Sequence, residues 1–159
     1  MMLNEQTEVK LAELKLSGML ESYREQMTNK EYQSMSFEDR FNLMVDLEHS
    51  RRKNNKLQRL IKSANFRNAS ASIEDIEYHP DRNLDKNLIL KLASGTYLEE
   101  HHNIILMGAS GNGKTYIANA FGIQACRQYY NVKYIRLPEL LYELTISKKQ
   151  AVGSFRKII

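Results

Sequence analysis

The chain has little of what stabilises small secreted domains or membrane spans. Of its 159 residues one is cysteine, Cys126, two are proline and none is tryptophan. A single cysteine excludes an internal disulfide framework, and no apolar run approaches the roughly 18 residues of a transmembrane helix. The polar opening of residues 1–6 does not resemble a secretory signal. We therefore expect a cytoplasmic protein that makes no membrane contact.

Metal-ligand patterns are equally scarce. The adjacent His101 and His102 lack the spacing of a zinc site, and no second cysteine supports one. We interpret both histidines as loop residues. The length fits one modest globular unit, or a small domain with a helical appendage.

One motif is complete. Residues 108–115 follow the phosphate-binding (Walker A) pattern G-x-x-x-x-G-K-[ST], with the members Gly108, Ala109, Ser110, Gly111, Asn112, Gly113, Lys114 and Thr115. The glycines let backbone N–H groups face phosphate oxygens, Lys114 places a cation on the β- and γ-phosphates, and the Thr115 hydroxyl ligates Mg²⁺. The motif predicts binding of ATP with Mg²⁺. It leaves the reaction type open, because kinases, ATPases and motors share it.

The surroundings of the motif suit an α/β core. The apolar run 104–107 before it predicts a buried parallel strand, and apolar residues from Ile117 to Cys126 recur at helical spacing. Residues 132–137 alternate like a second strand, and Pro138 fits the first turn of a helix through Leu144. The order strand, loop and helix predicts a P-loop fold built on a parallel sheet.

The basic charge is concentrated in one segment. Residues 51–67 hold seven Lys/Arg and no Asp/Glu, while the whole chain has a net charge of +4, so the rest is net acidic. On a helix, five of these cations share one side: Arg51, Arg52, Lys56, Arg59 and Lys62. Leu57, Leu60, Ile61 and Ala64 fall on the opposite side. This basic face is either a solvated helix surface or a contact for nucleic-acid phosphates.

The first part of the chain reads as helical. Residues 9–27 are amphipathic, and Ser36 with Asp39 resembles a capping box that starts a helix at Phe37. That helix either breaks near residues 54–55, or it continues as one long helix that contacts partners on opposite sides along its length. We predict a helical domain at 1–67, a linker at 68–83 and a nucleotide-binding domain at 84–159.

Taken together, these residues resemble the IstB-like ATPases, helper proteins of insertion-sequence transposition in the AAA+ group, which are related to the bacterial helicase loaders. The residues that carry the resemblance are 16–19, Ser36, Phe37, Glu48, Arg51, 60–62, Ala64, Phe66, Arg67, 82–85, 108–118, 125–126 and 153–154. The phosphate loop is common to many families, whereas the matches in the helical half distinguish this one.

The resemblance implies an AAA+ type fold and a helper that binds double-stranded DNA through its N-terminal helices. It also implies an ATP-dependent homo-oligomer that regulates a transposase. We assign the DNA contact to the basic face. The family continues beyond residue 159 with the strand that carries the Walker B acids, so we expect a truncated, incomplete parallel-sheet core. Glu139 and Glu143 do not replace those acids, no catalytic residue is named, and we expect ATP binding without efficient hydrolysis.

Two other functions fit the same residues. A replicative helicase loader shares the nucleotide core and would bind a hexameric helicase instead of a transposase. A non-hydrolysing DNA-binding fragment with a vestigial loop would assemble on DNA in the same way with and without ATP.

Overall fold

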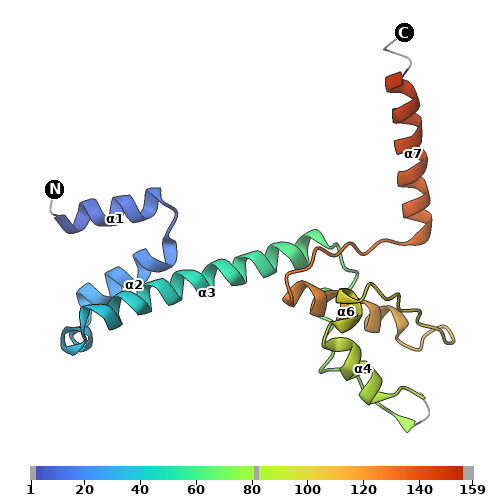
Figure 1. Cartoon of the computed structure of the whole chain (residues 1–159), viewed down its shortest axis with the longest axis horizontal. Helices are drawn as coiled ribbons and strands as arrows, with labels where there is room; N and C mark the ends of the chain where they lie inside the picture. Colours follow the sequence, from blue (N-terminus) through green and yellow to red (C-terminus); the bar gives the residue numbers. More distant parts are fainter. Residues whose placement is uncertain (1–2, 81–82, 156–159) are drawn as a thin grey trace. The chain divides into compact units, whose positions relative to one another are not determined.

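The computed structural model describes residues 3–80 and 83–155 (Figure 1). Arg82, one of the residues that carry the family resemblance, lies outside these ranges. The described elements are α1 (Leu3–Glu13), α2 (Ser17–Thr28), the 3₁₀ helix η1 (Lys30–Ser34), α3 (Phe37–Ser63), α4 (Lys86–Ala93), α5 (Thr96–Glu99), α6 (Lys114–Arg127) and α7 (Leu137–Phe155). No helix in this part of the chain combines the length and apolarity needed to span a membrane.

The predicted α/β fold class is wrong. The described residues, 3–80 and 83–155, form helices and no strand, so the parallel-sheet core expected after the helical segment is not present there. Strands were expected at residues 104–107 and 132–137, but 104–107 and 132–136 are irregular and Leu137 begins α7. A strand exists only where its N–H and C=O groups pair with a neighbouring strand, and an apolar pattern cannot supply that neighbour. Ile105 and Met107 are instead 80% and 88% exposed.

The chain divides into two compact units between Gln58 and Arg59. The domain boundaries expected from the sequence, at 67/68 and 83/84, stay predictions. In the first unit, the amphipathic stretch 9–27 forms two helices, α1 and α2, because Lys15 adopts a left-handed conformation (φ 58°) between them.

A buried carboxylate joins α2 to α3 within the first unit. Glu48 of α3 accepts hydrogen bonds from the backbone N–H groups of Gly18 at 2.7 Å and Met19 at 3.4 Å. Its other oxygen accepts from Arg52 Nε at 2.5 Å. The Arg52 hydrogen bond lowers the pKa of Glu48 against the opposing effect of burial, and the two amides lower it further. Glu48 thus caps the N-terminus of α2, whose first amides have no partner within their own helix.

Helix α3 is continuous, which decides between the two arrangements expected from the sequence. It begins as predicted at Phe37: Ser36 Oγ accepts from the N–H of Asp39 at 3.1 Å and donates to its carboxylate at 2.7 Å. Helix α3 ends at Ser63, and Asn65, in a left-handed conformation (φ 56°), turns the chain after it.

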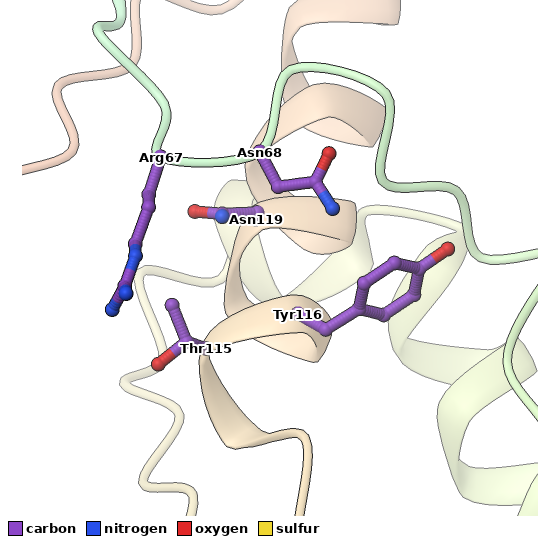
Figure 2. A pocket seen from close by; sticks show the side chains of 5 residues that line it. All are labelled: Arg67, Asn68, Thr115, Tyr116 and Asn119. Atoms are coloured by element: carbon purple, nitrogen blue, oxygen red, sulfur yellow. The ribbon is translucent and has the colours of Figure 1, made fainter.

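The segment after α3 is fixed onto α6 in the second unit. The Tyr116 hydroxyl accepts from the N–H of Ser72 at 3.3 Å and donates to its carbonyl at 3.5 Å. Figure 2 shows Tyr116 and Asn119 of α6 facing the stretch that carries Arg67 and Asn68. A backbone bond from Tyr134 N to Ala64 O, at 2.8 Å, holds the start of this segment.

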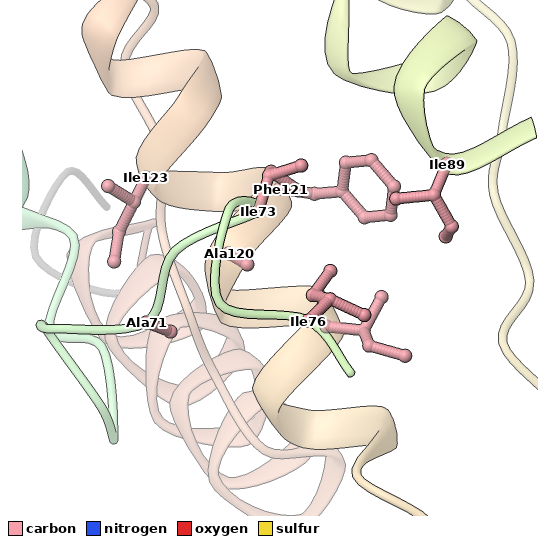
Figure 3. Packing of buried hydrophobic residues seen from close by; sticks show 8 residues of the cluster. Ala71, Ile73, Ile76, Ile89, Ala120, Phe121 and Ile123 are labelled. Carbon is pink, nitrogen blue, oxygen red and sulfur yellow. The ribbon is translucent and has the colours of Figure 1, made fainter. Parts of the chain in front are cut away.

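The core of the second unit forms around α6 (Figure 3). Segment 71–76, inside the stretch predicted as a linker, packs Ala71, Ile73 and Ile76 against α6 together with Ile89 of α4. Helix α6 starts at Lys114, inside the phosphate-binding motif, with the helical spacing of apolar residues that the sequence predicted, and contributes Ile117, Ala120, Phe121 and Ile123 to this core. The segment between the halves is therefore a structural part of the second unit.

Gly122 lets Phe66 approach α6 directly. A Cβ atom built on Gly122 would lie 2.5 Å from Phe66 Cε1 and 2.8 Å from Cζ. We expect Gly122→Ala to displace the Phe66 ring and to lower the free energy of unfolding by about 1–3 kcal/mol, the usual range for overpacking. Urea unfolding followed by circular dichroism measures this. Ala118→Gly, at an exposed position of the same helix, gives the intrinsic difference between Ala and Gly, about 1 kcal/mol in favour of Ala. A Gly122→Ala protein that is more stable by that full amount would show that the ring does not depend on this glycine.

Candidate functional site

The phosphate-loop residues form a tight turn into the N-terminus of α6. Gly111 and Gly113 have φ angles of 87° and 75°, a left-handed region that glycine enters without steric cost. Gly113 is the N-cap of α6 and supplies no side-chain cap. The first N–H groups of the helix are thus available as donors beside the positive end of the helix dipole.

Lys114 folds back over the loop. Its Nζ donates to the carbonyl oxygens of Gly108 at 2.8 Å and of Ala109 at 2.5 Å. No Asp or Glu occurs between Glu100 and Glu139, so no carboxylate of this stretch competes with an anion for the ammonium group. The exposed Thr115 follows on the first turn of α6.

Two hollows border the loop. The first, of about 140 Å³, places the apolar side chains of Leu84, Leu106 and Ile117 beside Lys114. The second, of about 320 Å³, lies at Thr115 on the first turn of α6, and Figure 2 shows the side chains that line it. Its lining residues are Arg67, Asn68, Thr115, Tyr116 and Asn119. Neither lining includes an Asp or Glu, so neither hollow offers a carboxylate as a general base.

The structure shows where the acids after the loop lie. Glu143 accepts from Lys133 Nζ at 2.7 Å, and Glu139 accepts from the N–H of Arg136 at 3.4 Å. Both acids are exposed at the start of α7. Within residues 3–80 and 83–155, no group of three His, Cys, Asp or Glu side chains is placed to hold a metal ion.

The residues of the predicted basic face all lie on α3. Arg51 pairs with Glu21, and Arg52 pairs with Glu48, both within the first unit. Lys56, Arg59 and Lys62 are exposed, whereas Leu57, Leu60 and Ile61 are half-buried and Ala64 is fully buried. The helix therefore has the two-sided character expected from the sequence, but Arg51 and Arg52 also have a structural role in holding α2.

Comparisons with known proteins identify the family. A sequence model described as "IstB-like ATP binding protein" matches residues 9–159. The chain is 40% identical over 158 residues to the insertion sequence IS1162 putative ATP-binding protein of Pseudomonas fluorescens, covering 99% of this chain and 68% of that relative. The chain belongs to the IstB-like ATP-binding protein family.

Other IstB-like relatives are longer than the matched region. The putative insertion sequence ATP-binding protein y4pL of Sinorhizobium fredii is 33% identical over 139 residues, which are 87% of this chain and 56% of the relative. The insertion sequence IS21 putative ATP-binding protein of Pseudomonas aeruginosa is 27% identical over 146 residues, which are 90% of this chain and 54% of that relative. The chain thus spans about two thirds of the first relative and little more than half of these two.

Sequence reasoning did not find every residue at the site of this IstB-like chain. In the sequence, Arg67 is the last residue of the basic segment 51–67, and Asn119 belongs to no motif. Both line the larger hollow next to Thr115. The spacing of Thr115 and Asn119, four residues apart on one helix face, was the available signal for Asn119, whereas no spacing rule connects Arg67 to them.

Proposed function

We propose that residues 108–115 bind ATP with Mg²⁺. Support comes from the left-handed glycines, the helix N-terminus without a side-chain cap and the acid-free surroundings of Lys114. The names of the relatives, all putative ATP-binding proteins of insertion sequences, point the same way. The observation that carries the proposal is the placement of Lys114 and the first amides of α6 around one turn.

Each residue has a definite part in this binding. The amides of the loop and of the first turn of α6 donate to phosphate oxygens. With ATP bound, the Lys114 ammonium would exchange the carbonyls of Gly108 and Ala109 for the β- and γ-phosphates, and the Thr115 hydroxyl would provide one oxygen ligand to Mg²⁺. ATP supplies a phosphoanhydride bond whose hydrolysis needs a positioned water. Because no carboxylate lines either hollow, this chain on its own binds ATP without efficient hydrolysis.

Equilibrium titration tests this part of the proposal. The purified chain should take up ATP and ADP in the presence of Mg²⁺ with a stoichiometry of about one, measured by isothermal titration calorimetry. Parallel phosphate-release assays should show hydrolysis no faster than a chain without a functional loop. Absence of uptake of both nucleotides would contradict the proposal.

We also propose that the exposed cations of α3 contact double-stranded DNA. Phosphate contacts release condensed counterions, so binding of this kind falls steeply with salt and carries little base specificity. Lys56, Arg59 and Lys62 are the residues to test, because all three are exposed and because changing Arg51 or Arg52 would break the ion pairs that hold α2 through Glu21 and Glu48.

Reversing Lys56, Arg59 and Lys62 to Glu is expected to lower DNA affinity by at least about tenfold and to reduce the slope of log K against log salt by about 3. Fluorescence anisotropy with a labelled duplex at several salt concentrations measures both. Reversal of Lys10, Lys30 and Lys91, exposed lysines elsewhere, is the matched control for net charge. Equal losses in the two triple variants would show that only net charge matters and would remove the assignment to α3.

At the level of the cell, we propose that the chain belongs to a helper of insertion-sequence transposition that assembles on DNA with ATP and regulates a transposase. The insertion-sequence names of its relatives support this reading. Affinity purification of the tagged chain together with the transposase of its own element tests the partner. Recovery of a hexameric helicase without the transposase would favour a helicase loader instead.

A further inference from the structure

The floor of the larger hollow is a buried amide without partners. Asn119 of α6 is 0% exposed, and neither its Oδ1 nor its Nδ2 has a hydrogen-bond partner among the described residues. Buried side-chain amides in folded proteins are nearly always paired, because leaving a donor or an acceptor unmet is destabilising. A buried residue with both groups unmet at the floor of a hollow points to a ligand that has acceptor and donor atoms.

The hollow adjoins the phosphate loop. Thr115 lies one helical turn before Asn119 on the same face of α6, and both line the hollow. Figure 2 shows Asn119 between Asn68 and Thr115, with Arg67 extending along one side. A group held at the Thr115 end of the loop is therefore within reach of the hollow.

The charge of the hollow favours an anion. Arg67 is its one ionised lining residue, and no acid faces it. Within the described parts of the chain Arg67 makes no ion pair or hydrogen bond. The start of α6 adds the positive end of a 14-residue helix. A guanidinium in this position is suited to a phosphate group, which it can contact with two parallel N–H donors.

The backbone of Arg67 is held in place. The preceding residue, Phe66, packs into the notch at Gly122, and the Tyr116 hydroxyl binds Ser72 further along the segment. Because anchors lie on both sides of Arg67, its guanidinium is presented to the hollow by a fixed segment of the second unit.

We propose that Arg67 and Asn119 read the terminal phosphate of a bound nucleoside triphosphate and so distinguish it from a diphosphate. Arg67 donates to the terminal phosphate, and Asn119 Nδ2 donates to a phosphate oxygen. Asn119 Oδ1 would accept from a water molecule that hydrates the bound nucleotide. This inference rests on the proposed binding of ATP at residues 108–115. It adds two positioning residues that lie outside the motif.

Calorimetric titration of the full chain with MgATP and MgADP tests the inference. Arg67→Gln is expected to lower affinity for ATP by about tenfold or more while leaving affinity for ADP within about twofold. Arg136→Gln, at an exposed arginine outside the hollow, is the control and should change neither affinity. Equal effects of Arg67→Gln on both nucleotides, or no effect on either, would overturn the inference.

The Asn119→Leu variant distinguishes a role of Asn119 in recognising the nucleotide from a role in stabilising the fold. Replacing an unpaired buried amide by an apolar side chain of similar size is expected to keep or raise the thermal unfolding midpoint without nucleotide. The preference for ATP over ADP should fall at the same time. A lower midpoint with an unchanged preference would mean that the amide has a structural role, and would contradict its assignment to the phosphate.

Two further outcomes distinguish this inference from the proposed function. If Lys114→Ala weakens both nucleotides while Arg67→Gln weakens neither, the loop binds ATP and the inference about the hollow fails. If Lys114→Ala changes neither affinity, the proposed ATP site fails first, and the hollow with it. Loss of duplex-DNA affinity in Arg67→Gln with unchanged nucleotide binding would assign the hollow to nucleic-acid phosphates and overturn the inference.

Discussion

Lys114→Ala is expected to lower the affinity for MgATP by about a hundredfold or more, because each charge-assisted hydrogen bond lost to a phosphate is worth about 1.5–3 kcal/mol and Lys114 supplies more than one. In the structure its ammonium group already lies against the loop, bonded to the carbonyls of Gly108 and Ala109. It therefore needs only a small movement to reach phosphates cradled there. Isothermal titration calorimetry with ATP and ADP measures the loss.

The control for this variant is Lys91→Ala, which removes an exposed lysine from α4. It should leave nucleotide affinity unchanged. The stability of Lys114→Ala without nucleotide should fall by less than about 1 kcal/mol, since the ammonium group bonds only to two carbonyl oxygens of an exposed loop. Unchanged ATP affinity in a folded Lys114→Ala protein would exclude the loop as the phosphate site.

The local features of the chain could be predicted from the sequence, because they depend on residues that are close together in the sequence. The cap formed by Ser36 and Asp39, the helix that begins at Lys114 and the opposite faces of α3 follow from short spacings, and the structure contains them. Helix α7 also starts near the expected Pro138, although it begins at Leu137 and extends to Phe155.

The features that failed or were missed depend on partners far along the chain. Residues 104–107 have a strand-like composition, but composition cannot show whether a neighbouring strand exists, and the described residues contain none. The contact of Gly18 with Glu48 joins residues 30 positions apart. The packing of Phe66 against Gly122 is another long-range contact. Periodicity describes one element at a time, so it gives no sign that Glu48 is buried.

The second large effect is expected at Gly18, where α2 and α3 approach closely. A Cβ atom on residue 18 would lie 2.7 Å from Glu48 Cα and 2.8 Å from Glu48 N. Because these are backbone atoms, no side-chain rotation relieves the overlap. Gly18→Ala should separate the helices, break the 2.7 Å bond to the carboxylate and destabilise their packing by about 2–5 kcal/mol. Amide hydrogen exchange of α2, measured by mass spectrometry, reports this locally.

Ser17→Ala, at the exposed neighbouring position, is the matched control and should leave exchange in α2 nearly unchanged. Protection of α2 that stays equal in Gly18→Ala and Ser17→Ala would contradict the close approach of the two helices.

A variant of Glu48 separates the contribution of the carboxylate charge from that of the steric fit at Gly18. Glu48→Gln keeps an oxygen for the amides of Gly18 and Met19 but loses the charge that pairs with Arg52.

The pH dependence of hydrogen-exchange protection in α2 shows whether the charge of Glu48 stabilises the contact between α2 and α3. The Arg52 hydrogen bond lowers the pKa of Glu48 in the folded chain, so the carboxylate stabilises the α2 and α3 contact above its unfolded pKa of about 4.3. That stabilisation is lost as the pH falls below the unfolded pKa and through the lower pKa that Glu48 has in the folded chain. Protection of α2 should therefore decrease on acidification in the wild type and less so in Glu48→Gln. Parallel acid profiles for the two proteins would show that α2 is held by packing at Gly18 and not by the charge of Glu48.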